Sequence, residues 1–149
     1  MRAVVQRTRK ANVEVEGKII GAITGGLVVF LGVSKDDEQA DADYLADKIA
    51  GLRIFEDQAG LMNLSIKEKE GEILCISQFT LFGDCRKGRR PGFSDAASPE
   101  KAIVLYDYFC EKLRQHSQNV AVGRFQSHML VYVENDGPVT VLLDSRKTF

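Results

Sequence analysis

The chain has no tryptophan, only two histidines and only three cysteines. Cys75, Cys85 and Cys110 are widely spaced and odd in number, which excludes the paired pattern of a disulfide-rich secreted domain. We therefore expect reduced thiols in a cytoplasmic protein. His116 and His128 stand apart, and no CxxC pair occurs, so the sequence offers no cluster typical of a zinc site. We predict that the protein uses neither a metal nor another cofactor.

Long hydrophobic runs are also missing. The longest, Leu27–Leu31, has the length of a strand and is far too short to span a membrane. The first residues, Met1–Val5, lack the long apolar region of a signal peptide and read as a first strand. With 20 basic and 21 acidic residues, the net charge of −1 excludes a protein that coats nucleic acid through global charge. A local RNA site remains possible.

The hydrophobic pattern predicts a mixed α/β fold. The chain has 149 residues and is 44% hydrophobic, enough for one domain, residues 1–149, with a real core. Helical spacing of Ala42, Leu45, Ala46 and Ile49 predicts a helix from the acidic stretch at Asp36 to Ala50, and Ser98-Pro99-Glu100 is typical of the start of a second helix. The expected strands are Val4–Glu16, Ile19–Ile23, Leu27–Leu31, Leu52–Phe55, Leu61–Leu64, Glu72–Phe79, Val120–Val122, Met129–Val133 and Val139–Leu143. We predict a mixed, partly barrel-like β-sheet with two main helices packed against it.

One candidate site lies at the end of the strand that begins at Glu72. Ser77, Gln78 and Thr80 bring three hydrogen-bonding side chains together around Phe79. Polar residues that merely finish a strand are the simpler interpretation of so short a segment. In the enzymatic interpretation, main-chain N–H groups and the hydroxyls polarise an ester carbonyl. A Ser or Thr nucleophile needs an activating base, and no histidine is near in sequence, so a simple serine-hydrolase mechanism is disfavoured.

The second candidate segment is Asn135-Asp136-Gly137-Pro138, which interrupts two strand-like runs. A β-turn is one interpretation. A cis Gly137–Pro138 peptide is the other, since X–Pro bonds tolerate the cis form. A cis peptide in a tight turn aims successive carbonyl oxygens the same way. Such a rigid pair of acceptors would hold an α-amino group and block a misplaced side chain.

A basic cluster follows the first segment. Arg86, Lys87, Arg89 and Arg90 place four cations within five residues. The cluster is either a solvated loop or a set of phosphate contacts near the mouth of a site.

These segments resemble the D-aminoacyl-tRNA deacylase family nearly from end to end. Besides Ser77–Leu81 and Asn135–Thr140, the similarity covers Met1–Arg7, Gly88–Phe93 with the start of the second helix, and Gly123–Phe125 with Met129. The Ser-Gln-Phe-Thr and Asn-Asp-Gly-Pro forms favour the D-specific enzyme over its animal relative. One departure is Gln126-Ser127-His128, where the family usually has small residues plus an acid or similar polar group. This departure bears on substrate preference and leaves the reaction class unchanged.

The resemblance implies a hydrolase of the ester bond between a D-amino acid and tRNA, acting also on glycyl-tRNA mischarged on alanine tRNA. It implies a homodimer in which Gly137 and Pro138 of one subunit, fixed by Arg7, enter the site of the other. L-amino acids would then be excluded by the two carbonyls.

The resemblance implies that the catalytic residues are those of one segment, namely Ser77, Gln78, Phe79 and Thr80. Thr80 is the family's historical nucleophile candidate. The alternative uses the 2′-hydroxyl of the RNA to activate water, with main-chain donors around Phe79 holding the oxyanion, and the missing base favours it. Phe125 and Met129 are candidate walls for the terminal adenosine, although ordinary core packing explains them as well. A non-catalytic RNA-binding module and a generic serine esterase remain alternatives.

Overall fold

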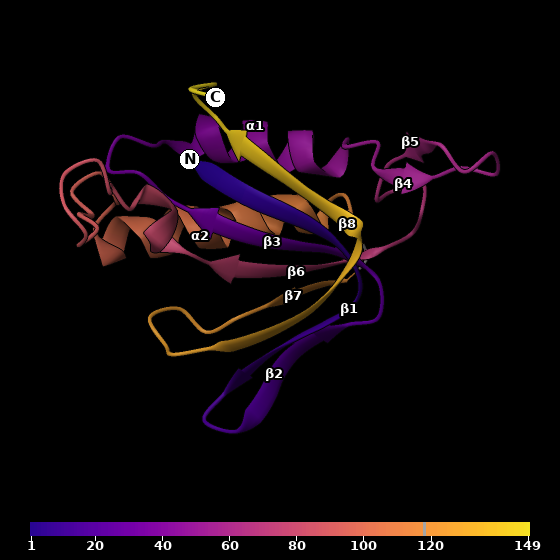
Figure 1. Cartoon of the computed structure of the whole chain (residues 1–149), viewed down its shortest axis with the longest axis horizontal. Coiled ribbons are helices and arrows are strands. Elements are labelled where there is room, and N and C mark those ends of the chain that lie inside the picture. The colour runs from indigo at the N-terminus through magenta and orange to yellow at the C-terminus, as the bar shows by residue number, and fades with distance from the viewer. Residues whose placement is uncertain (118) are drawn as a thin grey trace.

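The computed structural model describes residues 1–117 and 119–149. It consists of one curved sheet, two helices on one side of that sheet, and a small hairpin that projects from one end (Figure 1). In chain order the elements are β1 (Arg2–Val15), β2 (Lys18–Ile23), β3 (Gly26–Gly32), α1 (Gln39–Ala50), β4 (Phe55–Glu56), β5 (Met62–Leu64), β6 (Glu72–Ser77), the 3₁₀ helix η1 (Phe79–Phe82), α2 (Pro99–Arg114), β7 (Val120–Val122) and β8 (Leu130–Asp144).

The main sheet is mixed, as the sequence predicts. Its strand order is β2-β1-β3-β6-β7, and β8 pairs with β1. The pairs of β1 with β2, β3 and β8 are antiparallel, whereas β3–β6 and β6–β7 are parallel. The parallel connections need crossovers, and α1 and α2 lie in those crossovers. The small second sheet contains only β4 and β5.

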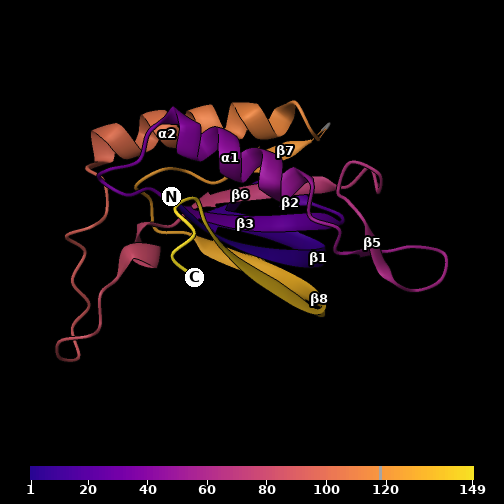
Figure 2. The same ribbon diagram turned by 90° about the horizontal axis from the view of Figure 1, so that it is seen from above.

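The sheet has apolar side chains on both faces, and this gives two cores. Figure 2 shows α1 and α2 side by side over one face. Side chains such as Leu45, Ile49 and Phe109 fill the layer between helices and sheet and are fully buried. On the other face the sheet curls over a second cluster that includes Val13, Leu74 and Ile76. Strands β3 and β6 are buried on both faces, which explains their nearly unbroken apolar sequences.

The curl brings β2 close to β7, so that the sheet is nearly closed into a barrel. A Cβ atom at Gly21 of β2 would lie 2.9 Å from the main-chain oxygen of Val122 in β7. Only glycine permits so close an approach of the two backbones. The predicted partly barrel-like α/β fold with two main helices is therefore confirmed.

Local signals explain where several elements begin and end. Glu16 and Gly17, between β1 and β2, both have positive φ, as the mirror-image turns of tight hairpins require. Ser98 caps α2 by accepting a hydrogen bond from the N–H of Lys101, with Pro99 in the first turn. The predicted start of the first helix, at Asp36, was too early. Helix α1 begins at Gln39, because Glu38 and Asp41 form a capping box there.

Three strand predictions were wrong in their bounds. The expected strand Leu52–Phe55 is reduced to the short β4. The strand expected to reach Phe79 ends at Ser77, where the chain turns into η1. The two runs Met129–Val133 and Val139–Leu143 form one strand, β8, because β1 is long enough to pair with both of them.

The packing of α2 predicts a large difference between its two faces. Phe109 is fully buried between the helices and the sheet, whereas Val104 is 62% exposed on the same helix. We expect Phe109→Ala to lower the free energy of unfolding by about 3–5 kcal/mol, because it leaves a cavity in the core. Val104→Ala, the matched control, should change it by less than about 0.5 kcal/mol. Urea denaturation measures both, and equal effects would contradict this account of the core.

Candidate functional site

The first candidate segment lies where β6 ends and the chain turns sharply. Gln78 still donates its main-chain N–H to the oxygen of Leu31, at 2.7 Å, and η1 then begins at Phe79. The first N–H groups of a helix have no partner within that helix. No residue of the described chain accepts a hydrogen bond from the N–H of Phe79 or Thr80. Two main-chain donors are therefore available beside the end of a rigid buried strand.

A cavity of about 770 Å³ opens beside this turn. It lies between the end of β6, the start of α2, the start of β8 and the segment that precedes β8, and apolar side chains dominate its surface. The lining residues are Val33, Ile76, Ser77, Gln78, Phe79, Phe93, Ala96, Ala97, Pro99, Ala102, Phe125, Gln126, Ser127, His128, Met129 and Val131. A cavity of this size and character matches the general form of small-molecule sites.

Five of the predicted site residues meet at this cavity. Ser77, Gln78, Phe79, Phe125 and Met129 all line it. The hydroxyl of Thr80 is instead hydrogen-bonded by the side-chain amide of Gln78, and Thr80 is not among the lining residues. A mainly apolar wall beside a few polar groups suits a nucleoside or a side chain better than a highly charged ligand.

The structure adds cavity residues that sequence reasoning missed or noted only in passing. Val33 and Ala97 come from two distant segments that lie side by side, with the N–H of Ala97 bonded to the oxygen of Val33 at 2.9 Å. Small apolar residues in loops carry no signal of such a role. His128, noted above only as a departure from the family pattern, also lines the cavity, together with Gln126 and Ser127.

Two aromatic rings mark the mouth of the cavity. Phe79 is 56% exposed, and its ring meets that of Phe93 edge-on with centroids 5.0 Å apart. Deeper in the fold, the hydroxyl of Tyr106 donates to the main-chain oxygen of Cys75 at 2.8 Å. Burial raises the pKa of Tyr106 far above its ordinary value. Tyr106 therefore stays protonated and is a structural donor, with no capacity to act as a base.

The second candidate segment is a bulge in β8. Gln6 of β1 pairs with Thr140 and Thr8 pairs with Asn135, so two steps along β1 correspond to five along β8. The surplus residues of β8 are pushed out of the ladder. Asn135 closes the base of the bulge by donating to the main-chain oxygens of Arg7, at 2.9 Å, and Val139, at 3.0 Å.

The peptide between Gly137 and Pro138, at the top of this bulge, is cis, which is one of the two forms expected from the sequence. Both residues are exposed. Arg7 is only 6% exposed and lies beneath them. Its Nε contacts the main-chain oxygen of Asp136 at 3.3 Å and the carboxylate of Asp136 at 3.2 Å, and its Nη1 donates to the oxygen of Ile54 at 2.7 Å. Arg7 thus ties the bulge to the base of the β4–β5 hairpin.

The bulge lies level with the start of β6, whereas the cavity opens beside the other end of that strand, which Figure 1 shows. The base of the bulge, at Thr8, is level with Gly26 of β3 and Glu72 of β6. Ser77 is five residues further along β6, which at 3.3 Å per residue is roughly 16 Å along the strand direction. Neither Gly137 nor Pro138 lines the cavity. Within one chain, therefore, the two predicted parts of the site do not meet.

The basic cluster occupies the tip of a loop that extends away from the sheet between η1 and α2 (Figure 2). Paired main-chain hydrogen bonds between Asp84 and Gly92 close the loop. The guanidinium of Arg86 contacts the carboxylate of Asp84 at 2.8 Å and lowers the pKa of that carboxyl to about 2. The charge of Arg86 is thereby balanced, whereas Lys87, Arg89 and Arg90 form no ion pair with any described residue.

Two kinds of feature are missing from the part of the chain that the structure describes. There, no group of three or more His, Cys, Asp or Glu side chains is arranged to bind a metal ion. None of the described helices has the length and apolar character that crossing a membrane requires.

Comparison with known proteins gives one consistent result. The family model for D-Tyr-tRNA(Tyr) deacylase matches residues 4–144. A D-aminoacyl-tRNA deacylase of Thermosipho melanesiensis is 60% identical over 150 residues, and one of Thermotoga petrophila is 58% identical over 149 residues; both alignments cover 100% of each chain.

Two solved structures share the fold. A structure titled c-Myc DNA Unwinding Element Binding Protein is 42% identical, with a TM-score of 0.92 over 97% of this chain and 98% of that one. A probable eukaryotic D-amino acid tRNA deacylase has a TM-score of 0.83 over 96% and 98%, and at 20% identity it supports the fold alone. The full-length match to the family model and to relatives at about 60% identity leads to one conclusion: this chain belongs to the D-Tyr-tRNA(Tyr) deacylase family.

Proposed function

We propose that this chain acts as a homodimer in which each active site combines the cavity of one subunit with the Gly137–Pro138 bulge of the other. The reaction follows from the family: the chain is a hydrolase that cleaves the ester bond of D-aminoacyl-tRNA. Family membership favours this enzyme over a non-catalytic RNA-binding module or a generic esterase. A charged tRNA as substrate agrees with action in the cytoplasm.

The observation that carries this proposal is the separation of the two motifs. The bulge projects from the far end of the sheet with Gly137 and Pro138 exposed, and the Ser77 end of β6 opens into the cavity. In a dimer with a two-fold axis, a contact between the bulge of one subunit and the cavity of its partner would occur twice, so both active sites would be complete.

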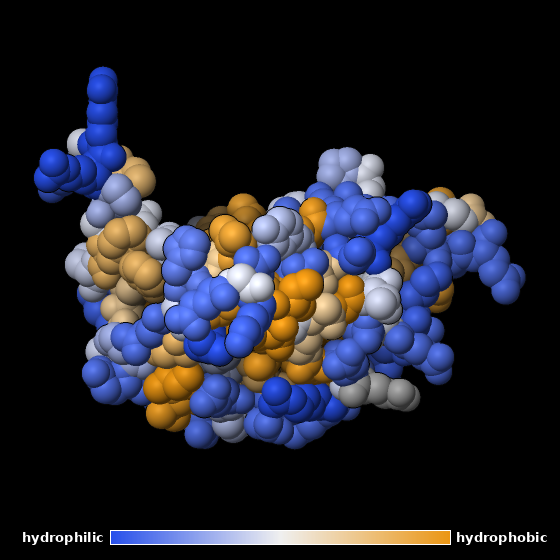
Figure 3. All heavy atoms as spheres, turned by 90° about the horizontal axis from the view of Figure 1, so that it is seen from below, coloured by the Kyte–Doolittle hydropathy of each residue, from blue (hydrophilic) through white to orange (hydrophobic). Residues whose placement is uncertain are grey.

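The exposed surface of β8 supports a second copy as the partner. Leu130, Tyr132 and Leu142 alternate along β8 and are 47–59% exposed. Apolar side chains also gather in the middle of the face drawn in Figure 3. An exposed apolar surface of this kind is typical of an interface between subunits.

In the proposed dimer, selection is by exclusion. The carbonyl groups beside Gly137 and Pro138 would accept hydrogen bonds from the α-amino group of the substrate and leave no space for an L side chain. D-amino acids of different sizes and glycine would both fit, since neither projects a side chain toward the bulge. Arg7 supports this selection because its buried guanidinium holds Asp136, the residue before Gly137.

For the chemical step, the N–H groups of Phe79 and Thr80 would hold the oxyanion that forms on the ester carbonyl. A water molecule activated by the 2′-hydroxyl of the terminal adenosine would attack. Phe125 and Met129 would contact the adenosine. The hydroxyl of Thr80 accepts a hydrogen bond from the side-chain amide of Gln78, and Thr80 does not line the cavity. Both observations favour a structural role for this hydroxyl over a nucleophilic one.

Mixing two inactive variants tests the shared site. Gly137 has φ of +122°, and a Cβ there would lie 3.0 Å from the N of Val139, so Gly137→Ala should deform the bulge. Ala96→Trp should fill the cavity. Each homodimer should be inactive toward D-aminoacyl-tRNA, yet subunit exchange should restore about a quarter of the wild-type activity, because half of the dimers regain one of two sites.

The controls for this experiment are a double variant carrying both changes and L-aminoacyl-tRNA as substrate. Mixing the double variant with either single variant should restore no activity, because no pair of these subunits combines an intact cavity with an intact bulge from the partner. The L-ester should remain intact in every mixture. Full activity of a monomeric wild-type protein, or no recovery after verified exchange, would contradict the shared site.

Thr80→Ala tests the nucleophile. Because Gln78 already donates to this hydroxyl and none of the described side chains is hydrogen-bonded to it as a base, we expect deacylation within about 10-fold of wild type. Single-turnover rates measure the effect, and a thermal melt checks folding. A folded variant that loses as much activity as removal of a true nucleophile causes would establish a covalent mechanism.

The loop cations are tested through salt. If Arg89 and Arg90 contact phosphates of the tRNA, their joint replacement by Ala should reduce the slope of log affinity against log salt by roughly 1.5–2. The control is the double replacement of Lys67 and Lys69, which are also exposed but lie elsewhere on the surface. Unchanged binding at every salt concentration would assign the loop to solvated surface.

A further inference from the structure

We infer that the buried ion pair between the α-ammonium group of Met1 and Asp37 positions one wall of the substrate cavity. This inference rests on the proposed function, because it takes the cavity beside Ser77 as the substrate site. It adds Asp37, which lies outside the cavity, as a positioning residue for the reaction.

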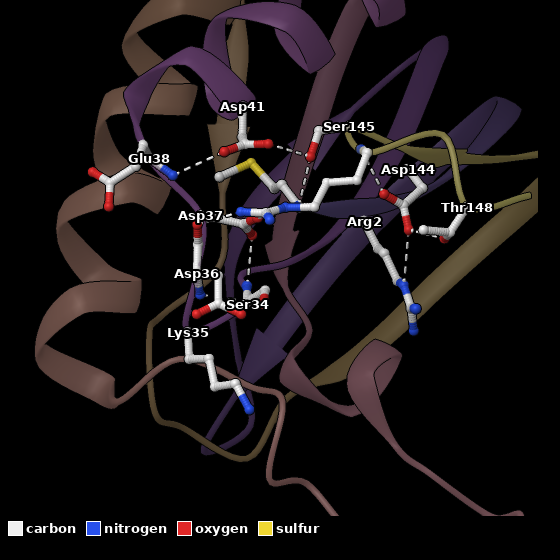
Figure 4. A network of polar contacts seen from close by, with 12 residues as sticks. Arg2, Ser34, Lys35, Asp36, Asp37, Glu38, Asp41, Asp144, Ser145 and Thr148 are labelled. Atoms are coloured by element: carbon white, nitrogen blue, oxygen red, sulfur yellow. Dashed lines mark hydrogen bonds and ion pairs between the residues drawn. The ribbon is translucent and has the colours of Figure 1, made fainter.

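The ion pair is completely enclosed. The α-ammonium nitrogen lies 2.6 Å from Asp37 Oδ1, and neither group is accessible to solvent. The same nitrogen donates to Ser145 Oγ at 2.7 Å, and Ser145 in turn donates to Asp41 at 2.6 Å. Figure 4 shows Asp37 and Asp41, near the start of α1, and Ser145, near the end of the chain, pointing toward one another. A buried charge of this kind persists only where its partners satisfy it.

The second oxygen of Asp37 acts on a different segment. Asp37 Oδ2 accepts a hydrogen bond of 2.6 Å from the N–H of Ser34, and the N–H of Asp37 returns to the oxygen of Ser34 at 3.1 Å. One carboxylate therefore joins the ammonium group to the turn that follows β3. Arg146 Nε, 3.7 Å from Asp37 Oδ1, is the other cation nearby.

The turn fixed by Asp37 carries the cavity wall. Lys35 donates its N–H to the oxygen of Asp95 at 3.1 Å, and Ala97 donates to Val33 at 2.9 Å. Val33, Ala96 and Ala97 all line the cavity. A continuous series of short polar contacts thus runs from the α-ammonium group through Asp37 and Ser34 to the wall formed by Val33, Ala96 and Ala97.

The chemistry of the reaction makes small shifts of this wall costly. An ester held in a cavity must meet the donors around Phe79 with little freedom, and displacements of about 1 Å reduce rates and affinities strongly. Val33, Ala96 and Ala97 are apolar and act only by shape, so their position depends on the segments behind them. Asp37 is the buried charge in those segments.

Asp37→Asn tests the inference, with Asp36→Asn as the matched control because Asp36 is exposed on the same turn. For Asp37→Asn we expect the KM for D-aminoacyl-tRNA to rise on the order of 10-fold while kcat stays within about 2-fold, as loss of substrate positioning without loss of chemistry would give. Amide hydrogen exchange at Lys35 and Ala97 should accelerate in the same variant. Asp36→Asn should change neither quantity.

A milder variant covers the case in which Asp37→Asn does not fold. Ser145→Ala removes one acceptor from the ammonium group and leaves Asp37 in place, and it should raise KM in the same direction with faster exchange at Ala97. A folded Asp37→Asn or Ser145→Ala protein with wild-type KM and wild-type exchange would overturn the inference. That result would leave the shared site intact, since subunit exchange tests the shared site independently.

Discussion

The pairing of β1 with three other strands is the interaction on which the rest of the structure depends. Its first half has β3 on one side and the end of β8 on the other, and its second half has β2 and the start of β8. Removal of β1 would separate β2 and β8 from each other and from the β3-β6-β7 part of the sheet, because each of them pairs with β1. The fourteen residues of β1 therefore hold the curl and the helix-covered half in one sheet.

The same pairing creates the bulge. Because both halves of β8 are held in register on β1, the surplus residues between Asn135 and Thr140 cannot be absorbed by sliding and must leave the ladder. The side chain of Arg7, at the point where the register changes, then contacts Asp136 and Ile54. A strand that is continuous on both sides of its bulge holds the projecting residues on a rigid base, which is the property that selection by steric exclusion requires.

The sequence predicted the parts of the molecule that depend on local chemistry. The second helix with its Ser98 cap, the apolar β3 and the apolar run of β6 follow from capping, burial and strand signals, whereas the end of β6 was placed two residues too late. Single-residue features such as the cis Gly137–Pro138 peptide were also considered from the sequence, because proline restricts the options. The continuity of β8 was not predictable, since it depends on the length of a partner strand more than a hundred residues away.

The candidate site also contains residues that local chemistry reveals and residues that only the folded structure reveals. Ser77, Gln78 and Phe79 carry polar or main-chain signals at a strand end, and the structure brings them to one cavity. Val33, Ala96 and Ala97 complete that cavity and have no distinctive chemistry in the sequence. Their role arises from main-chain hydrogen bonds between segments about sixty residues apart. Sequence patterns report what a residue can do chemically, whereas these residues contribute shape.

Shape of this kind needs a rigid support, and the two halves of the proposed site obtain it in similar ways. Behind the bulge lies Arg7, a buried cation that binds carbonyl oxygens. Behind the cavity wall lies Asp37, a buried anion that binds a main-chain N–H and the α-ammonium group. Each charge is costly to bury and is stable only with its partners in place. A buried charge therefore permits few alternative arrangements of its surroundings. Such rigidity suits the proposed selection, because steric discrimination between mirror-image substrates requires walls that do not shift.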